Sequence, residues 1–286
     1  MKNEIGVITS LTAEGRCLER VADFGLDLCQ LSCWNPDLYS TERAKAVRRE
    51  SEESGVRITS LWAGWPGPAV WDFVEGPLTL GLVPPEYRDI RIEALVKGAD
   101  FAHSAGIPAI ATHLGFIPEN PGDPVFGEMV DAVRGIAERL KGMGMEFWFE
   151  TGQETPVAML RLIEEVGTGN LGVNLDPANL ILYGKASPVD SLDVFGRHVR
   201  GVHAKDGLYP TDPMKLGAEV KVGEGRVRFP ELVRRLRDEG FDGAYIIERE
   251  ISGEQQNRDI AETVAYLRSL LADRPEAMSR EEDHSQ

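Results

Sequence analysis

The sequence predicts a single-domain α/β protein, a (β/α)₈ TIM barrel over residues 1–272. Two observations predict this fold. Eight short apolar runs have the character of buried strands, and segments of helical periodicity separate them to the end of that range. A strand followed by a helix must cross over to a parallel neighbour, and eight such units in about 275 residues close into a barrel. An open doubly wound sheet is the main alternative, but no GxGxxG motif follows the first run.

The predicted strands are EIGVITS (4–10), LDLCQLSCW (26–34), VRITSLWAG (56–64), IPAIATHLG (107–115), MEFWFETG (145–152), LGVNLDPANL (171–180), VRGVHAKDG (199–207) and GAYIIEREI (243–251). Apolar residues recur at helical spacing between and after them, for example over 126–140, 229–236 and 260–271. Capping residues and prolines predict helix starts at Thr155-Pro156, Ser187-Pro188 and Pro230. Glycines predict helix ends at Gly106, Gly142 or Gly144, and Gly240. The polar segment 273–286 is predicted to be a disordered tail.

Composition and charge favour chemistry on a small molecule. A hydrophobic content of 42% can fill a large core, whereas a formal net charge of −16 disfavours nucleic acid as a partner, because clustered Lys and Arg bind phosphates. No apolar run approaches the roughly 20 residues of a membrane span, and the first residues lack the apolar core of a signal peptide. We therefore expect a cytoplasmic protein with no membrane partner. Cys17, Cys29 and Cys33 have no motif spacing and are expected to be reduced packing residues.

The connection after the third predicted strand, residues 65–85, is unusually long and apolar. In a barrel this connection lies on the face that carries the active site. Trp62, Trp65, Trp71 and Phe73 are therefore candidates to wall a substrate pocket, and Trp62 and Trp65 are assigned to substrate binding. Packing on a neighbouring subunit explains the same pattern equally well. A homodimer or homotetramer is accordingly expected.

Five consecutive predicted strands, the fourth to the eighth, end on a side chain that can bind a metal: His113, Glu150, Asp176, His203 and Glu248. Each has a simpler alternative. Asp176 precedes a proline and could cap a helix, His203 could be a hydrogen-bonded core residue, and Glu248 lies in a charged run. One divalent cation explains the last four together, because three carboxylates and an imidazole suit Mn²⁺, Mg²⁺ or Co²⁺. Mn²⁺ is the expected ion, with Mg²⁺, Co²⁺ and Zn²⁺ as alternatives.

The order Glu, Asp, His, Glu on strands five to eight resembles the xylose isomerase-like barrels, the sugar phosphate isomerase/epimerase group. The resemblance covers about residues 4–272 and is most specific in VHAKD (202–206) and in VGEGRVRFPELVRRLRDEGFDGAYIIERE (222–250). It implies that Glu150, Asp176, His203 and Glu248 are the metal ligands. It also implies that His113, Lys205 and Asp206 lie near the substrate.

The sequence departs from one branch of this group, the ketohexose 3-epimerases. Those enzymes also carry a His three residues after the metal Asp, an Arg six after the metal His and a Glu six after the first metal Glu. Here those positions are Asn179, Tyr209 and Pro156, which argues against a free-ketohexose 3-epimerase. We expect Asn179 to hydrogen-bond a substrate hydroxyl and Glu154 or Gln153 to replace the missing acid.

The predicted activity is that of a divalent-metal-dependent isomerase or epimerase of an unphosphorylated sugar, keto-sugar or polyol-derived substrate. The metal stabilises an enediolate, and Glu150 and Glu248, three strands apart, exchange protons on its two faces. A lyase of the same barrel, either an inosose dehydratase or an enzyme that eliminates an aglycone from a 3-keto-glycoside, is the alternative. The charge disfavours a DNA-repair nuclease resembling endonuclease IV. The complete ligand set disfavours a barrel that binds a ligand without catalysis.

Overall fold

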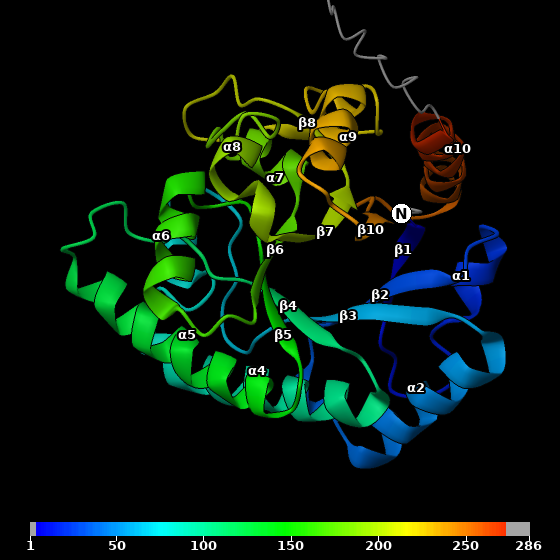
Figure 1. The fold of residues 1–286 in the computed structure, drawn as a ribbon, viewed down its shortest axis with the longest axis horizontal. Coiled ribbons are helices and arrows are strands. Elements are labelled where there is room, and N and C mark those ends of the chain that lie inside the picture. The colour runs from blue at the N-terminus through cyan, green and yellow to red at the C-terminus, as the bar shows by residue number, and fades with distance from the viewer. Residues whose placement is uncertain (1–3, 273–286) are drawn as a thin grey trace, which may run out of the picture.

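The computed structural model describes residues 4–272 and shows eight parallel strands in a closed barrel (Figure 1). The strands are β1 (Glu4–Ser10), β2 (Leu28–Cys33), β3 (Arg57–Ala63), β4 (Ala109–His113), β5 (Glu146–Glu150), β6 (Leu171–Leu175), β7 (Val199–Ala204) and β10 (Ala244–Ile247). Strand β10 pairs with both β1 and β7, so the sheet closes on itself. The predicted fold class is confirmed. The predicted tail, residues 273–286, lies outside the described residues.

Helices follow the strands and surround the barrel (Figure 1). They are α1 (Glu19–Asp23), η1 (Pro36–Leu38), α2 (Thr41–Ser54), α3 (Gly76–Thr79), α4 (Pro85–Ala105), α5 (Pro124–Gly142), α6 (Pro156–Val166), α7 (Pro177–Leu182), α8 (Leu192–Phe195), η2 (Gly196–His198), α9 (Phe229–Asp238) and α10 (Glu254–Ala272). Helix α5 buries the apolar residues that predicted it, among them Phe126, Met129, Val133 and Ile136. Helix α5 therefore covers the barrel with the face that its periodicity indicates.

The structure places some element boundaries differently from the sequence prediction. Thr155 caps α6 as expected, and its hydroxyl accepts a hydrogen bond from the N–H of Ala158. The run 171–180 is divided, because Asp176 ends the strand and caps α7. Residues 188–191 form a turn, and α8 begins only at Leu192. The expected helix start at Ser187-Pro188 is therefore wrong by one turn.

The long connection after β3 packs firmly onto the barrel. Arg91 on α4 is fully buried, and its guanidinium donates hydrogen bonds to the carbonyl oxygens of Gly81 (2.6 Å), Pro68 (2.8 Å) and Pro66 (3.2 Å). A buried guanidinium whose three nitrogens each donate a hydrogen bond fixes this segment at three points along the chain. Val74 and Leu78 remain exposed, and a neighbouring subunit in the expected oligomer would cover side chains of this kind.

A small antiparallel hairpin, β8 (Asp206–Leu208) and β9 (Ala218–Val220), follows β7 and was not predicted. Asp206 at its start is buried. Its carboxylate accepts hydrogen bonds from the backbone N–H groups of Gly207, Gly223, Gly225 and Val227 at 2.8 to 3.1 Å. A Cβ atom at Gly225 would lie 2.0 Å from Oδ1 of Asp206. The glycines of the VGEGR motif therefore allow the chain to wrap around this carboxylate.

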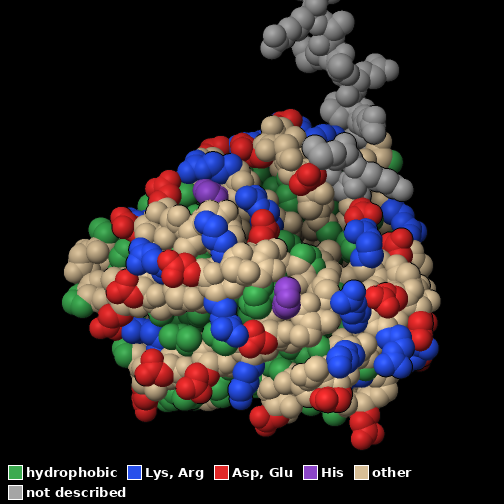
Figure 2. Space-filling view, turned by 60° about the horizontal axis from the view of Figure 1, so that its bottom comes forward, with side chains coloured by type: hydrophobic (Ala, Val, Ile, Leu, Met, Phe, Trp, Pro, Cys, Tyr) green, Lys and Arg blue, Asp and Glu red, His purple; other side chains and the backbone are tan. Residues whose placement is uncertain are grey.

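The surface and the cysteines agree with the composition. Figure 2 shows Lys and Arg side chains interspersed with Asp and Glu over the face in view, in contrast to the clustered basic surface of a nucleic-acid-binding protein. Within residues 4–272, no helix is long and apolar enough to span a membrane. The three cysteines are buried and unbridged, and burial raises the pKa of the Cys17 thiol to about 12.

Candidate metal centre

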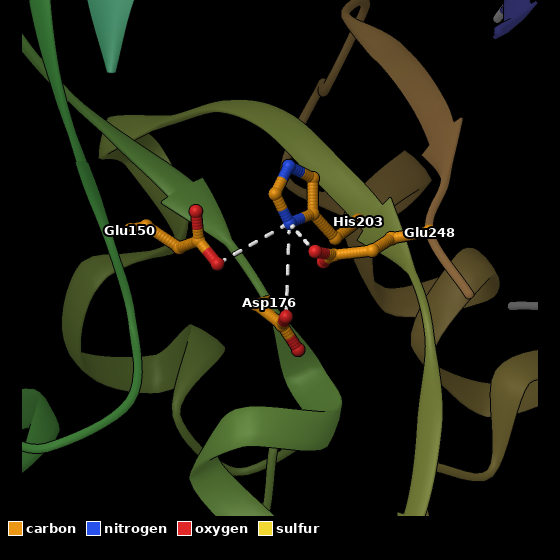
Figure 3. A group of neighbouring side chains, drawn as sticks. All are labelled: Glu150, Asp176, His203 and Glu248. Atoms are coloured by element: carbon orange, nitrogen blue, oxygen red, sulfur yellow. Dashed lines mark ion pairs between the residues drawn. The ribbon is translucent and has the colours of Figure 1, made fainter. Parts of the chain in front are cut away.

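Four side chains from neighbouring strands converge at the C-terminal end of the barrel (Figure 3). Glu150 ends β5, His203 lies on β7, and Asp176 and Glu248 directly follow β6 and β10. One ligand atom from each residue lies within 4.8 Å of the others. The parallel strands end at the same mouth, which is why residues almost a hundred positions apart meet there.

The facing atoms suit a cation. Nδ1 of His203 lies 3.0 Å from Oε2 of Glu248, 3.4 Å from Oε1 of Glu150 and 3.6 Å from Oδ2 of Asp176. Nδ1 of His203, Oδ2 of Asp176 and Oε2 of Glu248 are all buried, yet none makes a hydrogen bond within the described chain. Buried polar atoms are normally paired. Three carboxylates and an imidazole that share one small space, with atoms that make no hydrogen bond facing inward, fit a divalent cation with oxygen and nitrogen ligands.

The charged groups of the cluster shift one another's pKa values toward the ionised forms. Burial alone would raise the pKa of Glu150, but the nearby His113 and His203 hold it well below its usual value. Burial would likewise lower the pKa of His203, but the carboxylates of Glu150 and Glu248 raise it well above its usual value. Without a cation, a proton on the imidazole therefore supplies the positive charge that the carboxylates require. A divalent cation would take over that role.

A second layer of polar residues orients His203. Its Nε2 lies 2.8 Å from Oε1 of Gln30 on β2, and Nε2 of Gln30 donates to Oγ of Ser60 at 2.9 Å. Because the amide of Gln30 is used as the donor to Ser60, its oxygen is the acceptor for His203. Nδ2 of Asn174 also lies 2.9 Å from Nε2 of His203, so two amides compete to place its hydrogen. With Gln30 as the acceptor, Nε2 of the neutral imidazole carries the hydrogen, and Nδ1 then has a lone pair that faces the carboxylates.

We expect Gln30→Met to weaken Mn²⁺ binding about 10- to 100-fold, because the substitution removes the acceptor that fixes the His203 tautomer. Titration of free Mn²⁺ by electron paramagnetic resonance measures this affinity. Gln30→Glu, which keeps an acceptor at the same place, is the matched variant and should bind at least as tightly as the unmodified protein. Equal affinity in Gln30→Met and the unmodified protein would rule out an orienting role.

Asp176 does two things at once. Its Oδ1 accepts the N–H of Asn179 at 2.8 Å and so caps α7, while Oδ2 turns toward His203 and Lys205. Helix capping and metal binding, which the sequence left as alternatives for this residue, are therefore compatible, because each uses a different oxygen of the same carboxylate.

Glu150 is held by three further residues that the sequence assigned to substrate binding. The indole N–H of Trp62 donates to Oε2, and Nδ2 of Asn179 donates to Oε1 at 3.2 Å. Nε2 of His113 lies 3.2 Å from the same Oε1. Trp62, His113 and Asn179 thus surround the carboxylate and also line the adjoining cavity.

Lys205 is buried beside the carboxylates. Its Nζ lies 3.5 Å from Asp176 Oδ2, 3.5 Å from Glu248 Oε2 and 2.7 Å from Glu250 Oε1. Burial would lower the pKa of this amine, but the three carboxylates, with Glu248 foremost, raise it well above its usual range. Lys205 is therefore a fixed positive charge beside the candidate metal centre.

A cavity of about 410 Å³ opens above the cluster. It is lined by Ile8, Ser32, Trp34, Trp62, Trp71, His113, Glu150, Asn179, Leu182, Tyr183, Leu216, Glu248 and Glu250. Cavities of this size suit small organic ligands. Glu150 and Glu248 of the candidate metal centre thus form part of the wall of a pocket large enough for a small organic ligand.

Three residues predicted to bind substrate lie behind this wall. Trp65 is buried against Trp34 and Trp62, with ring centroids 5.6 and 6.1 Å away. Asp206 uses both carboxylate oxygens to accept backbone N–H groups of its own loop, so the geometry favours a structural role for it. Glu154 is buried, and burial raises its pKa to about 7; its Oε1 accepts the N–H of Gly152 at 3.3 Å.

Sequence reasoning missed several residues of the pocket. Glu250 lies two residues after Glu248 and contacts Lys205, but in the sequence it reads as part of a solvated charged run. Trp34 directly follows β2, and its position at a strand end was the available signal. Tyr183 and Leu182 come from the end of α7, a short helix that the sequence analysis assigned in part to a strand.

A candidate metal centre at the C-terminal mouth of a (β/α)₈ barrel, beside a polar and aromatic pocket, is the arrangement expected of a metal-dependent barrel enzyme. Comparison with known proteins identifies the family within that class. Residues 18–270 match the model of the xylose isomerase-like TIM barrel family. The chain belongs to this family.

Solved structures agree with this assignment. A xylose isomerase domain protein from Planctomyces limnophilus is 35% identical, with a TM-score of 0.89, and the match covers 94% of this chain and 98% of that one. A D-tagatose 3-epimerase-like protein is 21% identical, with a TM-score of 0.68 over 93% and 97% of the chains. A xylose isomerase-like barrel from Mycobacterium smegmatis in complex with magnesium is 19% identical, with a TM-score of 0.66 over 89% and 86%. Other similar structures include further sugar epimerases and a probable dehydratase.

Proposed function

We propose that this protein is a divalent-metal-dependent isomerase or epimerase of an unphosphorylated sugar, keto-sugar or polyol-derived substrate. The observation that carries the proposal is the convergence of Glu150, Asp176, His203 and Glu248 on one point, with Glu150 and Glu248 in the wall of the cavity. Mn²⁺ is the ion we propose, because the donor set is three carboxylates and one imidazole. The magnesium complex of a family relative supports a divalent cation.

A bound cation supplies Lewis-acid polarisation of a substrate carbonyl and its neighbouring hydroxyl, which makes the adjacent C–H more acidic. The protein must then move the proton. Strands β5 and β10 are separated by β6 and β7 in the barrel, so Glu150 and Glu248 approach the pocket from different sides. Two carboxylates in that arrangement can remove a proton from one face of a carbon and return one to the other face, which inverts the configuration.

Glu150 and Glu248 differ in exposure and in the residues that contact them. The side chain of Glu248 is 19% exposed and that of Glu150 is 3% exposed. We assign proton removal to Glu248, since its greater exposure leaves it more accessible to a substrate in the cavity. Glu150 is fixed by Trp62, Asn179 and His113. We assign it metal binding together with proton delivery, with His113 as the neighbouring proton source.

The rest of the proposed substrate site follows from the cavity wall. Asn179 and Lys205 are proposed to bind substrate hydroxyls next to the metal centre, and Trp62 is proposed to pack against the sugar ring. Glu154 lies behind this wall and carries a pKa of about 7. We propose that Glu154 serves as a buried acid close to His113. It would take the role of the second glutamate of the ketohexose 3-epimerases, whose position is Pro156 in this chain. The proposed setting is the cytoplasm, without nucleic-acid or membrane partners.

Solvent exchange tests the proposed reaction. The metal-loaded protein is incubated in D₂O with a panel of ketoses, aldoses, inososes and 3-keto-glycosides, and products are analysed by mass spectrometry and NMR. We expect uptake of one deuterium at a carbon next to a carbonyl, with the carbon skeleton and the hydroxyl count unchanged. Loss of water or of an aglycone would instead identify a lyase, and an absence of exchange with the whole panel would contradict the proposal.

A further inference from the structure

Two tryptophans at the outer wall of the cavity are exposed although the surrounding structure holds them in place. Trp34 and Trp71 are 48% and 38% exposed, and their rings meet edge to face with centroids 6.2 Å apart. The ring of Trp34 lies 4.7 Å from that of Trp62, and the ring of Trp71 lies 5.1 Å from His113. An aromatic wall therefore runs from the metal centre outward to the solvent.

The chain makes specific room for Trp34. A Cβ atom at Gly64, directly after β3, would lie 2.7 Å from Cε3 and 2.9 Å from Cα of Trp34. Glycine at position 64 thus lets the indole and its backbone lie directly on the end of the neighbouring strand. Any larger residue there would push Trp34 away from the cavity.

Trp71 lies on a segment that is fixed on both sides. The next residue, Asp72, accepts three backbone N–H groups through Oδ1, at 2.7 to 3.0 Å, and so ties a tight turn. On the preceding side, Arg91 donates to the carbonyl oxygens of Pro66 and Pro68. A preformed, solvent-exposed aromatic pair next to a polar pocket is typical of a ligand-binding surface, since little conformational entropy is lost when a ring stacks on it.

Away from the candidate metal centre, the side chains that line the cavity offer no cationic partner to an anionic group. The described lining contains three glutamates and no Lys or Arg. The one lysine beside it, Lys205, is already paired with three carboxylates. A phosphorylated sugar would find no free cationic side chain in this lining, whereas a neutral ring with an apolar face suits the tryptophans.

We propose that Trp34 and Trp71 form a second subsite, which binds a neutral ring joined to the reacting sugar, so that the substrate is a glycoside rather than a free monosaccharide. This inference rests on the proposed function, because the reacting sugar occupies the metal centre. The second ring, whether a sugar or an aryl group, offers the same chemistry to the subsite, namely a flat face rich in C–H groups or π electrons.

Binding of matched glycosides to the metal-loaded protein tests the subsite. The probes are methyl β-D-glucoside, phenyl β-D-glucoside and cellobiose, together with their galactosyl counterparts methyl β-D-galactoside, phenyl β-D-galactoside and lactose. Affinities are measured by calorimetry and contacts by saturation-transfer NMR. We expect the two-ring ligands to bind about three- to tenfold more tightly than the methyl glycosides, as stacking on an aromatic pair predicts. The aryl and disaccharide arms show which kind of ring is preferred.

Variants locate the effect. Trp34→Ala and Trp71→Ala should reduce the preference for two-ring ligands to less than about twofold and leave the affinity for methyl glycosides nearly unchanged. Trp71→Phe should keep most of the preference. Leu78→Ala, an exposed apolar position in the connection that carries Trp71 but outside the cavity lining, is the matched control and should change nothing. Thermal unfolding of each variant establishes that it is folded.

Three results would overturn the subsite: equal binding of one- and two-ring ligands, no measurable binding of any probe at millimolar concentration, or an equal loss of both affinities in the alanine variants. These results are separate from the solvent-exchange experiment. Metal-dependent exchange with free monosaccharides and no preference for two rings would refute the subsite alone. A preference for two rings without exchange on any carbon would refute the proposed reaction alone.

Discussion

Removal of divalent cations is expected to abolish turnover and to lower the thermal unfolding midpoint, and added Mn²⁺ is expected to restore both. Three buried atoms of Asp176, His203 and Glu248 that make no hydrogen bond with the described residues are the physical reason, because a cation satisfies all of them together. An ion present at a hundred times its dissociation constant stabilises the folded state by about 2.7 kcal/mol. For a barrel of this size, that corresponds to a rise in midpoint of roughly 5–10 °C.

The pH dependence of this effect follows from His203. Its pKa is raised well above the ordinary value of 6.5 in the cation-free protein, so a proton must leave when the cation binds. Cation affinity should therefore rise with pH until the raised pKa is passed. The protonated imidazole stabilises the cation-free fold fully below about 6.5, and this contribution is lost as pH rises through the raised pKa. The midpoint difference between loaded and cation-free protein should thus widen with pH.

Controls for the metal prediction use the ligands themselves. His203→Ala should lose the Mn²⁺-dependent rise in midpoint, because its Nδ1 faces all three carboxylates. Calorimetry with and without EDTA, followed by Mn²⁺, Mg²⁺, Co²⁺ or Zn²⁺, compares the ions directly. Full activity after exhaustive chelation, or a midpoint insensitive to every ion, would mean that the four residues do not form a metal centre.

Glu248→Gln and Glu150→Gln should each lower kcat by about 10²- to 10⁴-fold, the range that positioned acid–base groups contribute. The amide keeps the size of the side chain but removes the ability to accept the proton. The two variants should differ in metal binding. Glu150 is buried among Trp62, His113 and Asn179, so the loss of its charge should also weaken Mn²⁺ affinity strongly. Glu248→Gln should keep more of that affinity.

The measurements for these variants are kcat, KM and Mn²⁺ affinity, with substrate proton exchange followed in D₂O. Glu86→Gln, an exposed position in the first turn of α4, is the matched control for a Glu-to-Gln change and should behave like the unmodified protein. Saturating Mn²⁺ should not rescue kcat in Glu248→Gln. Unchanged turnover in both active-site variants, with metal bound, would show that neither glutamate moves a proton.

Much of the fold could be predicted from the sequence because each strand is a short apolar run, bounded by glycines, prolines or helix-capping residues. The four converging residues could be found for the same reason, since a barrel brings its strand ends together whatever the connecting helices do. Local sequence patterns were less informative where a side chain binds backbone groups that are distant in the sequence. Asp206 looked like part of a substrate motif, yet its partners are backbone groups some twenty residues later.

The parts that could not be predicted depend on tertiary contacts. The β8–β9 hairpin lies between VHAKD and VGEGR in a stretch with no clear periodicity, and its strands have only three residues each. Glu250 belongs to the pocket because Lys205 reaches it from the neighbouring strand β7. The division of the cavity wall between Trp71, which lines it, and Trp65, which lies behind it, follows from how Arg91 folds the connection.

Because Asp176 both caps α7 and faces the candidate metal centre, a cation bound there would be coupled to the wall of the cavity. One oxygen of this carboxylate begins α7 and the other faces the metal centre, while Asn179, Leu182 and Tyr183, from that helix and its end, line the cavity. A cation that binds one oxygen of Asp176 would also stabilise the first turn of α7, which the other oxygen caps. Unfolding of that turn would in return leave the carboxylate less well positioned. We therefore expect ion occupancy and the shape of the cavity to affect each other.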